Sequence, residues 1–399
     1  MSRKSKSNRK KGTSLLQHKP DKAILYFAIL MAIFGAIMIF DASVYKATAE
    51  WGDQFYFLKQ QIIWIIVGLV PALLIYFWDY RKFLKLSFPL LILTIGLLLA
   101  VLLFGKEING ATRWLTVGPI DIQPAEFAKV VLIMYLSSWL AKKNYDYKDL
   151  KEAFASGLWN ELLSFVAILG IIAFLIVLEP DLGTTIIICA TSYIMFLVAG
   201  DSKAHTIGSL SVLGLLFLLG VAAAILEPYR LQRVQTYLSL LFTGKVADPR
   251  GTGYQMQQIL IGIGSGGILG KGFGQSRQRF GYLVENTAFT DSLFAVILEE
   301  LGLLGGTVIV LSWVFFLWRG LKIAVNAPDK QGQLLAAGIT IWLVLQALMN
   351  MAANVGLIPL TGIPNPFLTY GGSSTIVTLA GIAILLNVSK YTTNGKQRN

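Results

Sequence analysis

The sequence LKLSFPLLILTIGLLLAVLLF, at residues 84–104, decides the class of this protein. It contains one charged side chain, that of Lys85, and its length as a helix matches the roughly 30 Å hydrocarbon core of a bilayer. Similar runs recur along the 399-residue chain, which is 55% hydrophobic and 14% charged, with a mean hydropathy of +0.64. Since soluble domains carry roughly 25% charged residues, the sequence predicts a polytopic membrane protein.

Apolar runs bounded by polar or Gly/Pro clusters predict an all-α integral membrane protein with ten transmembrane helices. The expected spans are residues 23–41, 58–78, 84–104, 124–141, 162–178, 182–199, 205–226, 291–317, 333–353 and 373–389. The membrane domain thus covers residues 23–390. Between the seventh and eighth helices we expect one long extracytoplasmic loop, residues 227–290, in which residues 259–274 are apolar and Gly-rich, as in a re-entrant or interfacial element.

Basic residues predict the orientation of the chain, because Lys and Arg concentrate in short cytoplasmic loops. They follow the second, fourth, sixth, eighth and tenth spans, whereas residues 355–372 contain neither. Both termini are therefore expected to be cytoplasmic. Much of the net charge of +12 lies in residues 1–22, which we expect to form a disordered tail attracted to anionic lipid rather than to nucleic acid; residues 391–399 form a second tail.

The rare reactive side chains exclude several kinds of site. Cys189 is the only cysteine and lies in an apolar run, which excludes an intramolecular disulfide or a Cys-ligated cluster. His18 lies in the basic tail and His205 in an expected polar loop, so a His-centred triad or a His-rich metal site is not expected. Acid–base chemistry is expected to fall to carboxylates.

Asp291 is the carboxylate of greatest interest, because it lies where the long outer loop meets the eighth span. An acid at this boundary can be partly desolvated. Burial would raise its pKa and a neighbouring Arg or Lys would lower it. From position alone, two interpretations have equal weight: a reactive carboxylate, or a cap at the start of the eighth helix, for which Asp is a preferred residue.

Charged residues within a span cost about 2.5 to 3.5 kcal/mol each unless they are paired or face water. Glu126 and Lys129 lie three residues apart, on one face of the fourth helix, where they can pair with each other. This pair predicts either a neutral lock between two helices or the polar wall of a cavity. Of the adjacent Glu299 and Glu300 in the eighth span, at least one is expected to face the protein interior.

Polar residues at three other helix boundaries have both a structural and a functional interpretation. Asp181 can cap the sixth helix or bind a ligand. Asn350 and Asn354, four residues apart, are typical of hydrogen bonding between helices. Free backbone N–H groups and hydroxyls at the start of the tenth helix suit an anion or a simple cap. The residues there are Gly371, Gly372, Ser373 and Ser374.

Nine short motifs, taken in order and spacing, resemble the SEDS family of cell-wall glycosyltransferases (shape, elongation, division and sporulation proteins). They are NGATRW (109–114), QPAEFAK (123–129), EPDLGT (179–184), EPYR (227–230), GYQ (253–255), IGSGG (263–267), TD (290–291), EELG (299–302) and PFLTYGGSS (366–374). Residues 55–60 and 274–282 are more similar to the cell-division branch than to the elongation branch. Residues 284–291, VENTAFTD, lack the proline and histidine usual before this Asp, which leaves the role of Glu285 open.

The resemblance implies polymerisation of lipid II into glycan strands at the outer face of the bacterial cytoplasmic membrane, at the division septum. It assigns Asp291 as the general base, while Glu126 and Lys129 position the catalytic acid from the bottom of a central cavity. Further substrate contacts would come from Asp181 and from Tyr370 and the residues that follow it. The pyrophosphate would be bound by Arg113, Arg230, Arg233, Arg277 and, more weakly, Lys271.

The resemblance also implies partners and a cofactor. The expected partners are a class B penicillin-binding protein, which is a transpeptidase, other division proteins and membrane lipid, and a divalent cation, Mg²⁺ or Mn²⁺, could share the pyrophosphate. Two other functions are compatible with the same pattern: a flippase for lipid-linked precursors, or a noncatalytic scaffold for the transpeptidase. The polar motifs cluster toward the outer face, which favours chemistry there.

Overall fold

The structure is a computed structural model that describes residues 19–108, 111–118, 120–143, 145, 149–200, 202–225, 228–251, 253–280 and 287–392. Eight helical stretches in these ranges are long and apolar enough to cross a membrane. They are α1 (Lys22–Trp51), α2 (Tyr56–Phe77), Tyr80–Phe104 (α3, Tyr80–Phe83; η1, Leu84–Leu86; α4, Ser87–Phe104), α7 (Leu158–Leu178), α8 (Leu182–Ala199), α12 (Leu293–Val325), α13 (Lys330–Asn354) and α14 (Gly372–Ser389).

Two further helices coincide with the remaining predicted spans. These are α5 (Pro124–Leu140), which has 17 residues, and α9 (Lys203–Ile225). Each predicted span thus falls on a helix, and the number of helices that cross the bilayer stays a prediction. The two predicted tails lie outside the described residues except at residues 19–22 and 391–392.

The first helix is longer than predicted. Its start is capped by Asp21, whose Oδ1 accepts hydrogen bonds from the backbone N–H groups of Ala23 and Ile24. We expected the helix to end at residue 41, but α1 continues to Trp51, because the charge of the buried Asp41 is paired with Arg279 at 2.6 Å. A buried charge that is paired does not have to end a span.

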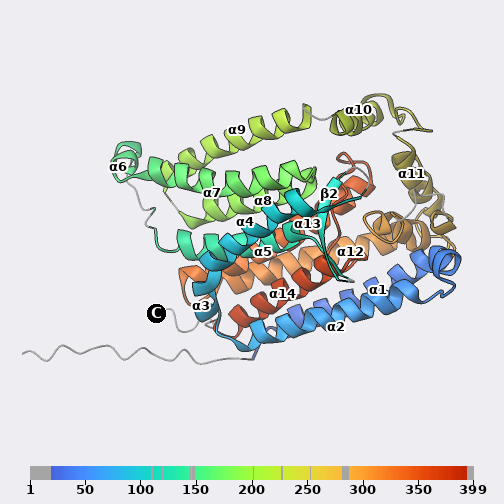
Figure 1. Cartoon of the computed structure of the whole chain (residues 1–399), viewed down its shortest axis with the longest axis horizontal. Coiled ribbons are helices and arrows are strands. Elements are labelled where there is room, and N and C mark those ends of the chain that lie inside the picture. Colours follow the sequence, from blue (N-terminus) through green and yellow to red (C-terminus); the bar gives the residue numbers. More distant parts are fainter. Residues whose placement is uncertain are drawn as a thin grey trace, which may run out of the picture.

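The long helices run side by side, with α3 and α6 (Leu150–Ala155) at one end of the molecule and α10 (Pro228–Thr243) and α11 (Tyr254–Gly266) at the other (Figure 1). Helix α13 packs against α12, α8, α5 and α14, and most of its side chains are buried. Helix α2 packs on α14 and α1, and α9 packs on α7 and α8. The centre of the bundle is therefore built around α13.

Helix α12 is broken at Gly302, whose φ of 65° and ψ of −168° are not helical. Across the break, Leu303 N–H donates to the carbonyl of Gly267 at 2.9 Å, and Lys271 N–H donates to the carbonyl of Glu299 at 3.0 Å. A side chain at residue 302 would collide with the backbone of Ile268 and Gly270. The end of the expected re-entrant element therefore supplies backbone hydrogen bonds that the helix lacks at this point.

A small antiparallel sheet departs from the all-α expectation. Its strands are β1 (Lys106–Ile108), β2 (Ala111–Val117) and β3 (Ile120–Ile122), in the order β1-β2-β3, between α4 and α5. Threonine and valine in β2 suit a strand, and the sheet was missed because it is too short for a clear periodicity. It positions Arg113 beside the turn between α7 and α8.

The expected loop position of His205 was wrong. His205 lies in the first turn of α9 and is fully buried, with its Nε2 2.8 Å from the carbonyl oxygen of Phe196 and its ring against Tyr145. The polar residues before it start the helix rather than extend the loop. The side chain is engaged in packing.

Candidate functional site

Asp291 lies just before α12 and is partly buried. Its Oδ1 accepts a hydrogen bond from the Thr290 hydroxyl at 3.1 Å, and Oδ2 accepts none from the described residues. The N-cap of α12 is Ser292, and no side chain caps this helix. The interpretation of Asp291 as the N-cap of α12 was therefore wrong, and its role as a reactive carboxylate stays a prediction.

The charge of Asp291 depends on opposing influences. Burial raises the pKa of this carboxyl above its ordinary value, while the Thr290 hydrogen bond and the positive charge of Arg233 act to lower it. The net direction is upward. Arg233 also donates from Nη1 to the carbonyl of Leu360 at 2.6 Å, which ties α10 to the loop before α14.

The loop before α14 approaches Asp291 at a glycine. Gly362 has a φ of 67°, and a Cβ built there would lie 3.8 Å from Asp291 Oδ2. The start of α8 presses on the same loop, since a Cβ at Gly183 would lie only 2.5 Å from Ile363 Cγ1. Glycine is thus required at residue 183 by the close approach of α8 to the loop, and at residue 362 by the left-handed backbone.

The predicted site residues Arg113, Asp181 and Ser373 converge on the start of α8. Asp181 caps α8 by accepting from the Thr184 backbone N–H at 3.0 Å, and its Oδ2 also accepts from Gln123 Nε2 at 3.2 Å. The Gln123 N–H donates to Ser373 Oγ at 3.0 Å. The cap predicted for Asp181 is confirmed, and its ligand role stays a prediction.

Arg113 is bound to the turn between α7 and α8. Its Nε donates to the carbonyl of Glu179 at 3.1 Å, and Nη2 donates to the carbonyl of Pro180. Both acceptors are backbone carbonyls, so neither bond is an ion pair. Its predicted pyrophosphate contact stays a prediction.

Glu179 is a buried carboxyl that sequence reasoning did not single out, although it begins the EPDLGT motif. Its exposed fraction is 0%, and neither carboxyl oxygen has a hydrogen-bond partner among the described residues. Burial raises its pKa to about 8, with a further upward contribution from Asp181 and a downward one from Arg113. With a pKa of about 8, Glu179 is mostly protonated at pH 7.

This raised pKa predicts a pH-dependent stability. The carboxyl ionises near pH 4.5 in the unfolded chain and near pH 8 in the folded one. The stabilisation from the retained proton is complete below pH 4.5, falls as the pH rises, and is lost above pH 8. Glu179→Gln should therefore gain melting temperature relative to wild type between pH 5 and 8, by the equivalent of a few kcal/mol at about 1.4 kcal/mol per pKa unit.

The measurement is thermal unfolding of the full chain in detergent from pH 5 to pH 9. The matched control is Glu107→Gln, at an exposed carboxyl of β1, which should show a constant difference from wild type. A Glu179→Gln difference that is equally constant would contradict a buried neutral carboxyl.

The start of α14 has no side-chain cap. Gly372 contacts the indole of Trp64, since a Cβ there would lie 2.7 Å from the ring. Tyr370 N–H donates to the carbonyl of Phe289 at 3.0 Å, and its ring packs on Phe57. Ser373 accepts the bond described above, and Ser374 is almost fully buried. Anion binding by Gly371, Gly372 and these serines stays a prediction.

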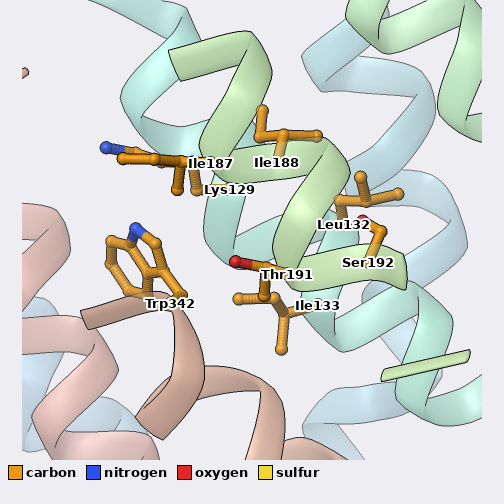
Figure 2. Close-up of a pocket in the computed structure, with 8 residues that line it drawn as sticks. All are labelled: Lys129, Leu132, Ile133, Ile187, Ile188, Thr191, Ser192 and Trp342. Atoms are coloured by element: carbon orange, nitrogen blue, oxygen red, sulfur yellow. The ribbon is translucent and has the colours of Figure 1, made fainter. Parts of the chain in front are cut away.

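The predicted pairing of Glu126 and Lys129 is confirmed, with 2.7 Å between Lys129 Nζ and Glu126 Oε1 and both side chains buried. Lys129 also donates to Gln346 Oε1 at 2.8 Å. Figure 2 shows Lys129 and Trp342 at a cavity of about 10 Å³, which is lined by Lys129, Leu132, Ile133, Ile187, Ile188, Thr191, Ser192 and Trp342. This space is at the lower limit of what a single water molecule needs.

The remaining predicted cations differ in their surroundings. Lys271 Nζ lies 2.6 Å from Glu299 Oε1, and both Glu299 and Glu300 are buried, so the expectation that at least one faces the interior is confirmed. Arg277 is exposed, and its side chain has no ion-pair partner in the described part of the chain. The side chain of Arg230, like the whole of Glu285, lies outside the described residues.

The similarity to known proteins extends over most of the chain. The family model described as "Cell cycle protein", which carries the names FtsW, RodA and SpoVE, matches residues 21–394. Stage V sporulation protein E of Bacillus subtilis is 38% identical over 381 residues, which cover 93% of this chain and 97% of that protein. A protein of Legionella pneumophila named probable peptidoglycan glycosyltransferase FtsW is 37% identical over 374 residues, covering 92% and 90%.

Two solved structures have similar folds. A chain from work on the structural coordination of polymerization and crosslinking by a peptidoglycan synthase complex superposes with a TM-score of 0.71 at 26% identity, covering 93% of this chain and 97% of that one. The rod shape determining protein RodA of Thermus thermophilus superposes with a TM-score of 0.66 at 23% identity, covering 94% and 98%. The second likeness concerns the fold alone.

Proposed function

This chain belongs to the FtsW, RodA and SpoVE family, the SEDS peptidoglycan glycosyltransferases, and from that membership we propose that it polymerises lipid II into glycan strands. It is an integral membrane protein. The proposed site faces outward, with both termini cytoplasmic and residues 227–290 on the extracytoplasmic side, as the distribution of Lys and Arg favours. The polyprenyl tails of the substrate would lie in the bilayer.

The observation that carries the proposal is the state of Asp291. The Oδ2 atom has no hydrogen-bond donor among the described residues and faces Gly362, which has no side chain. Because the side chain is only partly buried, we infer that an acceptor hydroxyl can approach this oxygen. A carboxyl whose pKa is raised is a stronger base when ionised, which suits removal of the proton from the acceptor 4-hydroxyl as the new glycosidic bond forms.

Cationic side chains would stabilise the pyrophosphate that leaves in this reaction. Arg233 is the best placed, because its charge acts on Asp291. Arg277 has an exposed guanidinium, and Arg113 lies at the turn between α7 and α8. Lys271 would have to share its charge with Glu299.

We propose a divalent cation, Mg²⁺ or Mn²⁺, only as an ion bound to the pyrophosphate of the substrate. The described residues do not bring together three or more His, Cys, Asp or Glu side chains that could hold a metal ion.

The partner we propose is a class B penicillin-binding protein that cross-links the new strands. The similar structure that concerns polymerization and crosslinking in one peptidoglycan synthase complex supports this partner. Relatives named FtsW favour a septal role together with other division proteins, and an elongation role of the RodA kind is the alternative within the family.

The experiment is glycan-strand formation from purified lipid II by the full chain in liposomes, with and without a cognate class B penicillin-binding protein. Polymer that depends on the chain is the expected result. Folded protein that yields no polymer with its cognate partner would overturn the proposal. Transfer of labelled lipid II between leaflets without polymer would then favour the flippase. If neither transfer nor polymer is observed, the scaffold is favoured.

A further inference from the structure

Three amide side chains lie on one face of α13. Gln346, Asn350 and Asn354 are spaced four residues apart, so they stay on the same side of the helix over two turns. Their exposed fractions are 0%, 3% and 1%. A buried amide without hydrogen bonds costs about 1–3 kcal/mol, so this face of α13, the amide ladder, needs polar partners.

Two of the three amides bind the backbone of Asp291. Asn350 Nδ2 donates to the Asp291 carbonyl at 2.7 Å, and Asn354 Nδ2 donates to the same oxygen at 2.9 Å. Two donors occupy both lone pairs of that carbonyl and so fix the rotation of the peptide plane that follows Asp291. A fixed peptide plane restrains the position of the Asp291 Cα, from which the carboxylate side chain projects.

Asn354 uses only the nitrogen of its amide, which also donates to the carbonyl of Asn350 in its own helix at 2.9 Å. Asn354 Oδ1 has no hydrogen-bond partner among the described residues, so Nδ2 makes the hydrogen bonds of this side chain. The Asp291 carbonyl is free to accept these bonds, since the first hydrogen bond of α12 goes to the carbonyl of Ser292. The ladder thus binds a backbone group that the helix itself does not use.

The ladder also binds the loop that approaches Asp291 Oδ2. Asn350 Nδ2 donates to the carbonyl of Ile363 at 2.9 Å, and Gln346 Nε2 donates to the carbonyl of Pro364 at 2.9 Å. Asn365 Nδ2 donates in turn to Asn350 Oδ1 at 3.2 Å. One helix face therefore holds the backbone of Asp291 and the backbone of the two loop residues that follow Gly362.

At its other end the ladder meets the buried ion pair. Gln346 Oε1 accepts from Lys129 Nζ at 2.8 Å and from Trp342 Nε1 at 2.7 Å. These two donors fix the orientation of the Gln346 amide, and with it the donor that binds Pro364. Hydrogen bonds thus run from the Glu126–Lys129 pair to the loop beside Asp291.

We propose that Gln346, Asn350 and Asn354 are positioning residues that hold the Asp291 backbone and the loop at residues 363–364 so that the Asp291 carboxylate is aimed at the acceptor hydroxyl. The proposal rests on the assignment of Asp291 as the base. None of the three side chains has to touch the substrate. Their contribution is to the rate of the chemical step rather than to binding.

The test compares Asn350→Ala and Asn354→Ala with Thr340→Val. Asn350→Ala removes two loop contacts, and Asn354→Ala is the milder variant in case the first fails to fold. Thr340 is a buried polar residue of α13 whose hydroxyl bonds only the carbonyl of Ala336 in its own helix, so Thr340→Val removes a polar group without touching the ladder. All are full-length chains, assayed with purified lipid II.

We expect both Asn variants to lower kcat at least tenfold with KM for lipid II within about twofold, and to displace the acid limb of the kcat–pH profile. A loss of folded protein alone would scale kcat and leave that limb in place. Hydrogen–deuterium exchange should become faster in residues 287–293 and 361–370 of both variants and stay unchanged in Thr340→Val.

Two results would overturn the proposed positioning role of the amide ladder. One is a wild-type kcat and acid limb in both Asn variants while Asp291→Asn is inactive. The other is wild-type exchange in residues 287–293. If wild type itself makes no polymer, the proposed function fails, and the exchange comparison still decides whether the ladder holds Asp291.

Discussion

Asp291→Asn should abolish lipid II polymerisation while the protein inserts and melts at or above the wild-type temperature. The amide cannot take up a proton from the acceptor hydroxyl, and loss of a general base lowers a rate by about 10²- to 10⁴-fold. Stability should hold, because Asp291 does not cap α12 and an Asn oxygen can still accept the Thr290 hydroxyl. The measurement is strand formation in liposomes together with the melting temperature.

Asp121→Asn is the matched control for this substitution. Asp121 in β3 also accepts a threonine hydroxyl, that of Thr116 at 2.6 Å, but it is exposed. It should polymerise as wild type does. Activity of Asp291→Asn close to that of this control would refute the proposed base.

The pH dependence of the wild-type rate offers a second readout. Only the ionised carboxylate accepts a proton, so the rate should rise with pH as Asp291 ionises. Because burial raises its pKa, this rise should lie at a higher pH than for an ordinary Asp side chain. A rate already at its maximum where ordinary Asp side chains ionise would contradict the raised pKa.

Lys129→Met should lower the free energy of unfolding by about 3–5 kcal/mol, because it leaves the buried Glu126 carboxylate without its ion-pair partner. The second oxygen of Glu126 already has no hydrogen-bond partner among the described residues. Gln346 Oε1 would also lose one of its two donors. Denaturant unfolding of the full chain in detergent measures the change.

An exposed ion pair provides the control. Lys59 and Asp53 are 2.7 Å apart, with side chains 65% and 37% exposed, and Lys59→Met should cost less than about 1 kcal/mol. The double variant Glu126→Gln/Lys129→Met should recover most of the stability, since it removes both buried charges. A Lys129→Met chain as stable as Lys59→Met would show that the buried pair contributes little.

Local pattern was sufficient for most helices. An apolar run of about 20 residues is stable as a helix in lipid whatever its neighbours are, so spans such as residues 182–199 coincide with α8. The pair of Glu126 and Lys129 was also predictable, because residues three apart on a helix are neighbours. The cap at Asp181 follows the same local logic.

Several assignments depended on contacts between distant residues. The end of α1 depended on Arg279, which lies 238 residues from Asp41. The carbonyl partners of Arg113 lie 66 and 67 residues away, and no spacing in the sequence shows that its guanidinium would bind backbone. The buried state of Glu179 likewise arises from packing, since its sequence motif does not distinguish a buried carboxyl from one exposed to water.

Asp291 illustrates both what the sequence predicts and what depends on the tertiary structure. Its position between the outer loop and an apolar span was visible in the sequence, as were Asn350 and Asn354, because each is a polar residue at the edge of or within an apolar run. That the amides bind the Asp291 carbonyl, 59 and 63 residues away, was decided only by the packing of α13 against the loop at residues 363–364. The hydrophobic pattern by itself determined most of the helices long enough to span a membrane. The partners of the buried polar groups were set by the tertiary structure, because a hydrogen bond requires two groups within about 3 Å.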